Sequence, residues 1–201
     1  MTSKIIQFIG PMDSNTPIDY ELDTIIIDGG LNRVYDTLSS FKKIKNIIGD
    51  NDSNITETSM TTKLPRDKDE SDLEYALKIV NENQYSNVRL NGFLGGRKDH
   101  EFANILTIIG IVKSKGPHPF RMYVDSQILI TNQTFEKLNH HGVFSVFSID
   151  NNILTISGKV KYPLLKKCIR PLSSHGISNE AHGKFEITNT NHTTLVIFFN
   201  E

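Results

Sequence analysis

Residues 24–30 read TIIIDGG, a β-branched run that ends in an aspartate and two glycines. A continuous apolar run of this length suits a strand that is buried on both faces, as in a parallel sheet. Similar Ile-rich runs occupy residues 4–9 and 45–48, and a looser one spans residues 87–94. These four runs predict an open, mainly parallel sheet.

Segments with helical spacing separate the predicted strands. Apolar side chains recur at i, i+3, i+4 and i+7 in three segments, which begin at Leu31, Leu73 and Phe102. Alternation of strands and amphipathic helices is typical of an α/β fold with right-handed crossovers. Residues 121–124 could supply a last strand, so we expect an α/β domain over residues 1–126.

The remainder of the chain has a different pattern. It contains short β-rich runs separated by Asn, Asp and Gly, at residues 127–131, 142–149, 153–156 and 193–199. No helical period of useful length occurs among them. Such spacing is typical of an antiparallel sandwich or barrel-like module. We therefore predict an all-β, sandwich-like domain over residues 127–201.

Charge and cysteine content limit the class of protein. The 22 basic and 23 acidic residues give a formal net charge of −1, which argues against bulk binding of nucleic acid. The single cysteine, Cys168, cannot form an internal disulfide, so a reducing compartment is favoured, and we interpret it as a small buried residue. No segment reads as a signal peptide or reaches the ~18 apolar residues of a membrane span. We expect a cytoplasmic protein that binds neither nucleic acid nor a membrane.

Acidic residues follow two of the predicted strands. Asp28 comes directly after residues 24–27, while Asp50 and Asp52 follow residues 45–48. Open parallel sheets bind ligands at the carboxyl ends of their strands. Three carboxylates gathered there would repel one another without a cation, and Mg²⁺ suits oxygen ligands beside phosphates. Each acid taken alone also fits a turn that ends a strand.

A second acidic segment, DKDESDLE, occupies residues 67–74. Ser71 and Glu74 fit a capping box at a helix start. Asp72 falls in the first helical turn, where the helix dipole favours an anion. The segment could contribute to a metal site or could be a solvated acidic helix start.

The stretch LNGFLGGRKDHEFANI, residues 90–105, contains two glycines before a cluster of charged residues. Its spacing is not that of a P-loop. Gly95 and Gly96 would let the backbone pass close to a ligand, and Asp99 would cap the following helix. Backbone N–H groups at that helix start, with Arg97 beside them, predict an anion site. Asp99 could hold Arg97 or contact the ligand itself.

Four motifs occur in an order that resembles the thiamine pyrophosphokinase (thiamine diphosphokinase) family. They are Gly49-Asp50-x-Asp52-Ser53, Lys68-Asp69-x-Ser71-Asp72-x-Glu74-x-Ala76-Leu77, Gly95-Gly96-Arg97-x-Asp99-His100 and Ser178-Asn179-Glu180. The likeness covers most of the chain, beginning at Asp28-Gly29-Gly30. It implies an α/β domain that holds ATP, a β-sandwich that holds thiamine, and a homodimer whose active sites are shared between subunits.

The resemblance also implies roles for individual residues. Those that match the family's magnesium-binding and catalytic acids are Asp50, Asp52 and Asp72, with Asp69 close by. Those expected on the ATP side are Asp28, Gly29, Gly30, Lys68, Ser71, Gly95, Gly96, Arg97 and Asp99. Those that match the thiamine-side motif are Ser178, Asn179 and Glu180. Tyr162-Pro163-Leu164 matches a family turn.

The implied reaction transfers the pyrophosphoryl group of ATP to the thiamine hydroxyl, giving thiamine diphosphate and AMP. Two alternatives remain open: another Mg²⁺-dependent phosphotransferase or phosphohydrolase, and a non-catalytic module that binds nucleotide or thiamine. The intact acidic set favours an enzyme, because a simple binding protein gains little from carboxylates clustered near phosphates.

One departure from the family concerns the residues that follow the Ser-Asn motif. Some members carry an aromatic residue there that stacks on the thiamine ring, whereas this chain has Ala181 and His182 and contains no tryptophan. The stack would have to come from His182, Phe185 or a residue of the partner subunit. The pair His140-His141 lacks partners at zinc spacing and is interpreted as part of a loop.

Overall fold

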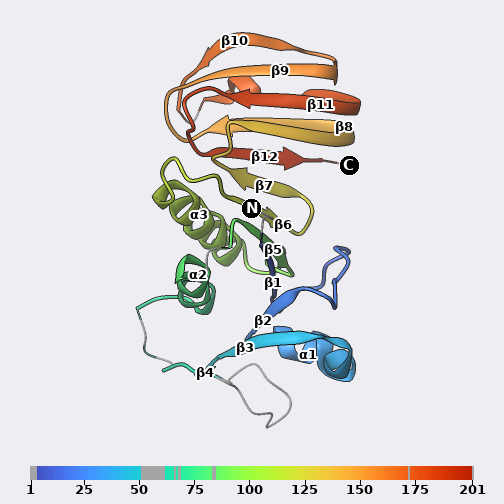
Figure 1. The fold of residues 1–201 in the computed structure, drawn as a ribbon, viewed down its shortest axis with the longest axis vertical. Coiled ribbons are helices and arrows are strands. Elements are labelled where there is room, and N and C mark those ends of the chain that lie inside the picture. Colours follow the sequence, from blue (N-terminus) through green and yellow to red (C-terminus); the bar gives the residue numbers. More distant parts are fainter. Residues whose placement is uncertain are drawn as a thin grey trace. The chain divides into compact units, whose positions relative to one another are not determined.

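The computed structural model describes residues 4–50, 62–65, 67, 69–82, 85–171 and 173–200. The chain separates into two compact units, Met1–Thr107 and Ile108–Glu201. The first contains β1 (Ile5–Ile9), β2 (Asp23–Ile27), α1 (Gly30–Val34), the 3₁₀ helix η1 (Tyr35–Ser40), β3 (Lys43–Gly49), β4 (Thr62–Lys63), α2 (Asp72–Glu82) and β5 (Asn87–Asn91) (Figure 1). Helix α3 (Lys98–Ser114) crosses the boundary between the units.

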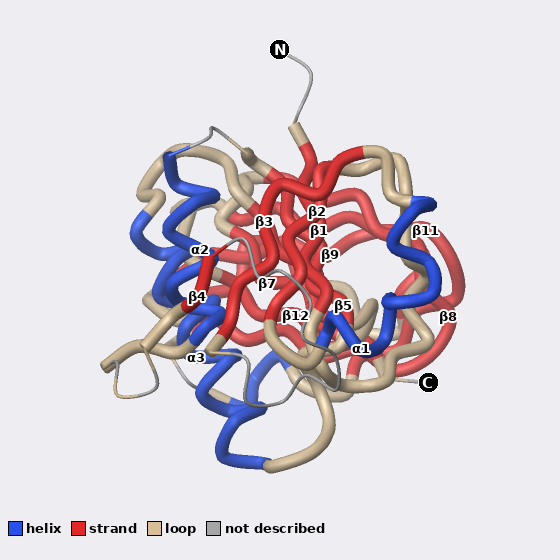
Figure 2. The backbone as a smooth tube through the Cα atoms, turned by 90° about the horizontal axis from the view of Figure 1, so that it is seen from below, coloured by secondary structure: helices blue, strands red, loops and turns tan. Residues whose placement is uncertain are grey.

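The strands of the first unit are all parallel to their neighbours, in the order β5-β1-β2-β3-β4. Their apolar side chains are buried on both faces, because α1 and α2 lie on opposite sides of β1–β3 (Figures 1 and 2). The one polar side chain within β1, Gln7, is satisfied there. Its Nε2 donates to Thr24 Oγ1 at 2.9 Å, and its Oε1 accepts from the Asp19 N–H at 3.2 Å.

Helix α2 has the buried stripe that its spacing predicts. Leu73, Ala76, Leu77 and Val80 are all 3% exposed or less. Ser71 caps the start of the helix, since its Oγ accepts a hydrogen bond from the Glu74 N–H at 3.1 Å. This hydrogen bond confirms the serine half of the predicted capping box.

Helix α3 is confirmed as a helix, but its predicted apolar stripe is wrong. Phe102 and Leu106 are 61% and 52% exposed, whereas Ile108 and Val112 are fully buried. The sequence ILTIIGIV at residues 105–112 is apolar at nearly every position. A helix that is apolar all round has no single face that periodicity can identify. No described helix is long and apolar enough to span a membrane.

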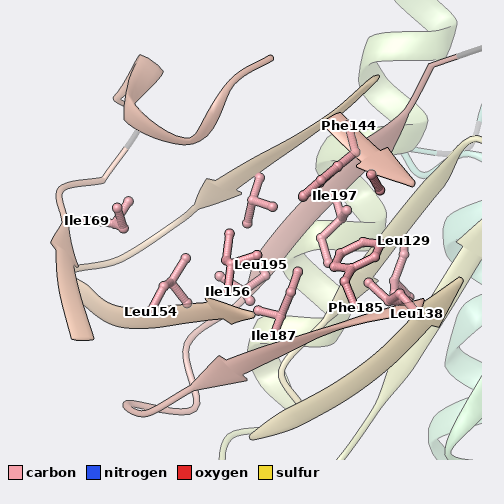
Figure 3. Close-up of a cluster of buried hydrophobic side chains, with 12 residues drawn as sticks. Leu129, Leu138, Phe144, Leu154, Ile156, Ile169, Phe185, Ile187, Leu195 and Ile197 are labelled. Atoms are coloured by element: carbon pink, nitrogen blue, oxygen red, sulfur yellow. The ribbon is translucent and has the colours of Figure 1, made fainter. Parts of the chain in front are cut away.

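Apart from the end of α3, the strands of the second unit form one continuous antiparallel sheet, rather than the two separate sheets of the predicted sandwich. Its strands are β6 (Arg121–Val124), β7 (Ile128–Thr131), β8 (Phe135–Ser148), β9 (Asn152–Val160), β10 (Leu164–Ile169), β11 (Asn179–Asn189) and β12 (Leu195–Phe199), with the short 3₁₀ helix η2 (Ser174–Gly176). They pair in the order β10-β9-β11-β8-β12-β7-β6. Inward-facing side chains from β7 to β12 form one apolar cluster (Figure 3). Phe144 and Phe185 stack within it, with their ring centroids 4.6 Å apart.

Two expectations about single residues in this unit are wrong. His140 and His141 lie inside the long strand β8 rather than in a loop. More exposed and more buried positions alternate along this strand, as in any strand with one covered face, although the Asn-His-His-Gly sequence suggests a turn. Cys168 is exposed rather than buried, because it lies on β10, most of whose side chains are exposed.

Gly30, where α1 begins, provides a test of how closely the helix approaches β1. A Cβ at this position would lie 2.3 Å from the carbonyl oxygen of Ile9. We expect Gly30→Ala to lower the free energy of unfolding by about 2 kcal/mol or more, measured by urea denaturation, because backbone would have to move. The control is Gly110→Ala in α3, where a Cβ meets open space, and it should raise stability by about 0.5–1 kcal/mol. Equal effects of both changes would contradict the close approach.

Candidate functional site

Aspartates and glycines follow the carboxyl ends of four parallel strands in the first unit. Gly10 follows β1, Asp28 follows β2, Asp50 follows β3 and Gly92 follows β5. Since these strands run in the same direction, their carboxyl ends form one edge of the sheet, where open α/β sheets bind ligands. The structure thus brings Asp28, Asp50 and the segment that starts at Gly92 to the same edge.

Asp28 is held in an unusual conformation at this edge. Its φ angle is +45°, in the left-handed region that Asn and Asp adopt more readily than most residues. Its N–H donates to the Ile48 carbonyl at 2.7 Å. A Cβ at Gly49 would lie only 3.2 Å from Asp28 Oδ1, so the carboxylate lies directly against the backbone that leads into Asp50.

Helix α2 begins on the same side of the sheet. Its first residue is Asp72, and the chain reaches it from the carboxyl end of β4, where the Leu64 N–H donates to Gly49 O at 2.9 Å. Asp69 is exposed in the preceding segment. Asp52 and Lys68 lie outside the described residues. Among the residues that the structure does describe, no three His, Cys, Asp or Glu side chains are close enough to hold a metal.

Arg33 of α1 joins the ends of β1 and β5. Its Nη1 donates to Gly10 O at 2.8 Å and to Asn91 O at 3.1 Å, and its Nη2 donates to Asn91 Oδ1 at 3.0 Å. The Asn91 side chain in turn donates to Thr16 O at 2.6 Å. Sequence reasoning missed Arg33, because a helical arginine three residues after a glycine gives no specific signal.

The glycine-rich loop passes over the residues that follow β1. Gly95 and Gly96 have φ angles of +94° and +72°, which explains the need for glycine at both positions. A Cβ at Gly96 would lie 2.8 Å from Met12 Sδ, whereas one at Gly95 would meet open space. Beside the loop lies a small cavity of about 160 Å³, lined by Pro11, Met12, Gly92, Phe93, Gly95, Arg97, His100, Glu101 and Asn104.

Arg97 and Asp99 form a bidentate pair at the mouth of this cavity. Arg97 Nε and Nη2 donate to the two carboxylate oxygens of Asp99 at 3.1 and 2.6 Å. Helix α3 begins at Lys98, so Asp99 lies in the first turn, two residues after the cap position, and the prediction that Asp99 caps this helix is wrong. The pair is largely exposed, with 71% of the Arg97 side chain and 65% of the Asp99 side chain accessible. Of the two roles considered for Asp99, the structure shows that it holds Arg97.

The hydrogen bond from Arg97 lowers the pKa of Asp99 to about 2, with smaller contributions from its charge and from the backbone N–H groups of His100 and Asp99. The same hydrogen bond raises the pKa of Arg97. The carboxylate is therefore ionised at any physiological pH, and the guanidinium keeps donors in place beside the cavity.

The Ser-Asn-Glu motif lies on the second unit, at the start of β11. Asn179 is buried and holds the Tyr162-Pro163 turn: its Nδ2 donates to Tyr162 O at 2.7 Å, and its Oδ1 accepts the Tyr162 N–H at 3.0 Å. Ser178 is exposed, with a φ angle of +59°. Glu180 accepts from Lys161 Nζ at 3.0 Å, and this hydrogen bond lowers the pKa of the carboxyl group.

His182 and Phe185, the two residues of this chain considered for stacking on the thiamine ring, differ in solvent exposure. Phe185 is 1% exposed inside the core and stacks on Phe144, so it cannot reach a ligand. His182 has 61% of its side chain accessible, and its Nε2 lies 3.6 Å from Glu180 Oε1. Of these two residues, only His182 is accessible enough to stack on a ligand.

The donor chemistry at the carboxyl edge of the first unit fits a hard cation. Asp28 and Asp50 are oxygen donors that follow two adjacent strands, and the Asp28 carboxylate lies against Gly49, the residue before Asp50. Mg²⁺ binds through one or two carboxylates and keeps several waters. A donor set with so few protein ligands is therefore compatible with Mg²⁺ and with a phosphate-bearing ligand beside it.

One family model matches the part of the chain that contains this edge of the sheet. Residues 20–118 match the family model of the thiamin pyrophosphokinase catalytic domain. No curated protein matches the chain significantly.

Solved structures share the fold over nearly the whole chain. The thiamine pyrophosphokinase of Bacillus subtilis has a TM-score of 0.76 and 24% identity over 98% of this chain and 100% of its own. The enzyme of Geobacillus thermodenitrificans has a TM-score of 0.73 and 20% identity over 98% of each chain. That of Candida albicans has a TM-score of 0.65 and 15% identity over 98% of this chain and 90% of its own.

The Arg97–Asp99 pair predicts a measurable pH dependence. Asp99 should titrate near pH 2 in the folded protein and near ~3.9 in the unfolded chain. Since the folded value is the lower one, the stabilisation by the pair is fully present above pH ~4 and is lost as the pH falls towards 2. Carboxyl ¹³C NMR should show the low midpoint and its rise towards 3.9 in Arg97→Gln, which removes the largest cause of the shift but keeps the backbone N–H groups. Lys98→Gln, whose ammonium pairs with Glu101 instead, should leave the midpoint unchanged; a low midpoint that survives in Arg97→Gln would refute the assignment.

Proposed function

We propose that this protein is a thiamine diphosphokinase that transfers the pyrophosphoryl group of ATP to thiamine, because residues 20–118 match the family model of the thiamin pyrophosphokinase catalytic domain. The observation that carries the proposal is the carboxyl edge of the parallel sheet. Two adjacent strand ends carry Asp28 and Asp50 there, and the loop after β5 carries a preformed Arg97–Asp99 pair. Acids and a guanidinium on one sheet edge suit a metal-bound polyphosphate.

In the proposed reaction, the thiamine hydroxyl oxygen forms a bond to the β-phosphorus of ATP, the bond from that phosphorus to the α,β-bridging oxygen breaks, and AMP leaves. Phosphoryl transfers of this kind depend on positioning and on charge stabilisation more than on covalent chemistry. Arg97 is suited to hold phosphate oxygens, because its planar guanidinium is already oriented by Asp99. Asp28, Gly29, Gly30, Lys68, Ser71, Gly95 and Gly96 complete the proposed ATP-binding set.

The proposed ligands for Mg²⁺ are Asp50, Asp52 and Asp72, with Asp69 nearby. The positions of Asp50 and Asp72 at the carboxyl edge support this assignment. When bound, Mg²⁺ would supply positive charge that stabilises the phosphate oxygens during transfer. The carboxylates would fix its position, and one of them is also suited to accept the proton of the thiamine hydroxyl.

We further propose a cytoplasmic homodimer in which thiamine, bound by Ser178 and Glu180 of one subunit, meets the ATP of its partner. The exposed thiol of Cys168 supports a reducing location. Asn179 serves this site by holding the Tyr162-Pro163 turn beside it. His182 is the side chain of this chain best placed to contact the thiamine ring, because it is exposed two residues after Glu180.

The decisive experiment measures AMP release as a function of both substrates. We expect release only when ATP and thiamine are both present, and a loss of at least 100-fold in kcat in Asp50→Asn, since a lost charge-stabilising ligand typically costs on the order of 10²–10³ in rate. Asp36→Asn, an exposed acid in η1, is the matched control and should retain full activity. Release of AMP without thiamine would indicate a phosphohydrolase, and binding without release a non-catalytic module.

The shared site predicts complementation between two inactive proteins. One carries Asp50→Asn with Asp52→Asn; the other carries Ser178→Asn with Glu180→Gln, which spares Asn179 and its turn. When both are unfolded and refolded together, random pairing makes half of the dimers mixed, each with one intact site of two. Roughly a quarter of wild-type activity should return under two-fold symmetry. If heterodimers form and the mixture stays inactive, each subunit works alone.

A further inference from the structure

The amino ends of the parallel strands carry a cluster of basic side chains that the proposed function does not use. Lys4 precedes β1, Asp23 begins β2, Lys43 begins β3 and Tyr85 precedes β5. Because the strands are parallel, all four residues lie at the edge opposite to Asp28 and Asp50. Lys45 joins them through an irregularity in the pairing of β2 with β3, which shifts the register by one residue after Ile44.

A single carboxylate organises this cluster. Asp23 accepts a hydrogen bond from Tyr85 Oη at 2.5 Å, and its two oxygens lie 3.5 Å from Lys43 Nζ and 3.6 Å from Lys45 Nζ. Lys4 Nζ lies 4.4 Å from the centre of the Tyr85 ring. Tyr85 is 5% exposed, so the floor of the cluster is fixed by packing while the ammonium groups stay accessible.

The charges of this cluster do not balance. Two ammonium groups lie beside the Asp23 carboxylate and a third lies over the Tyr85 ring, which leaves a net charge of +2 for these four charged groups. The contact between Lys43 and Lys45 raises the pKa of Lys43 and lowers that of Lys45. Two like charges that share one acid are destabilising unless an anion neutralises the excess.

The charge of the chain limits the kind of ligand that this cluster suits. The formal net charge of the whole chain is −1, which argues against an extended polyanion. The basic side chains of Lys42 and Arg89 already pair with Glu21 and Asp19. A small, compact dianion matches the local charge of +2.

The geometry points to a second anion site, formed by Lys4, Lys43 and Lys45 over the Asp23–Tyr85 floor, that binds a small phosphate-type oxyanion. Ammonium groups are strong donors to phosphate oxygens, and three of them converge on one carboxylate and one phenol here. The site lies at the opposite end of the strands from the proposed ATP site, so it is separate from the proposed reaction and does not depend on it.

The test is isothermal titration with inorganic phosphate at constant ionic strength and without divalent metal. Every protein carries Arg97→Gln, so that phosphate held at the carboxyl edge is not counted. We expect one site in this background, and at least a tenfold higher dissociation constant after Lys43→Gln with Lys45→Gln. The control pair is Lys137→Gln with Lys167→Gln, two exposed lysines of the second unit, which removes the same charge and should leave the constant within twofold.

Tyr85→Phe tests whether phosphate binding depends on the arrangement of the lysines around Asp23 or only on their total charge. Removing its hydroxyl releases Asp23 but keeps every lysine, so a built site should lose affinity severalfold while the net charge is unchanged. Circular dichroism checks that each variant is folded. Absence of phosphate binding, or equal weakening by the two lysine pairs, would overturn the proposal.

Discussion

The guanidinium of Arg33 fixes the edge of the sheet on which the candidate site depends. It donates hydrogen bonds to the carbonyls of Gly10 and Asn91 and to the Asn91 side chain at 2.8–3.1 Å, so it ties α1 to the carboxyl ends of β1 and β5. Glycine at position 92 leaves space for this side chain, since a Cβ there would lie 2.0 Å from Arg33 Nη1. The chain continues from Gly92 into the glycine-rich loop that contains Arg97. Three hydrogen bonds from one guanidinium thus hold in place the chain segments that follow β1 and β5.

The strands of the first unit could be predicted because a strand that is buried on both faces has a continuous run of apolar residues. Residues 24–27 and 121–124 fall within observed strands, and the looser run at residues 87–94 ends three residues early because Gly92 has a φ angle of +87°. Strands β10 and β11 were missed. Strand β10 is largely exposed, and in β11 buried positions alternate with charged ones such as Lys184 and Glu186. Both lack the continuous apolar run that identifies a buried strand.

The sequence predicted a site residue only where an acidic residue follows the end of a recognisable strand. Asp28 and Asp50 stand directly after apolar runs, and parallel topology then brings them to one edge. The contacts of Asn179 could not be foreseen, because they depend on a turn that lies 17 residues away in the sequence. The exclusion of Phe185 likewise needed the fold: only the register of β11 decides whether residue 182 or residue 185 faces the core. Sequence pattern therefore indicates which groups are available, and strand register decides which of them reach a ligand.

Strand length sets how the two charged edges of the parallel sheet influence each other. Asp23 anchors the lysine cluster at the start of β2, and Asp28 follows the last residue of the same strand. Five residues of extended chain separate them by about 16 Å. This distance exceeds the Debye length of ~8 Å at physiological ionic strength, so the lysines at one edge do not neutralise the acids at the other through solvent. A five-residue strand is thus long enough for one sheet to keep an acidic edge suited to a metal and a basic edge suited to an anion.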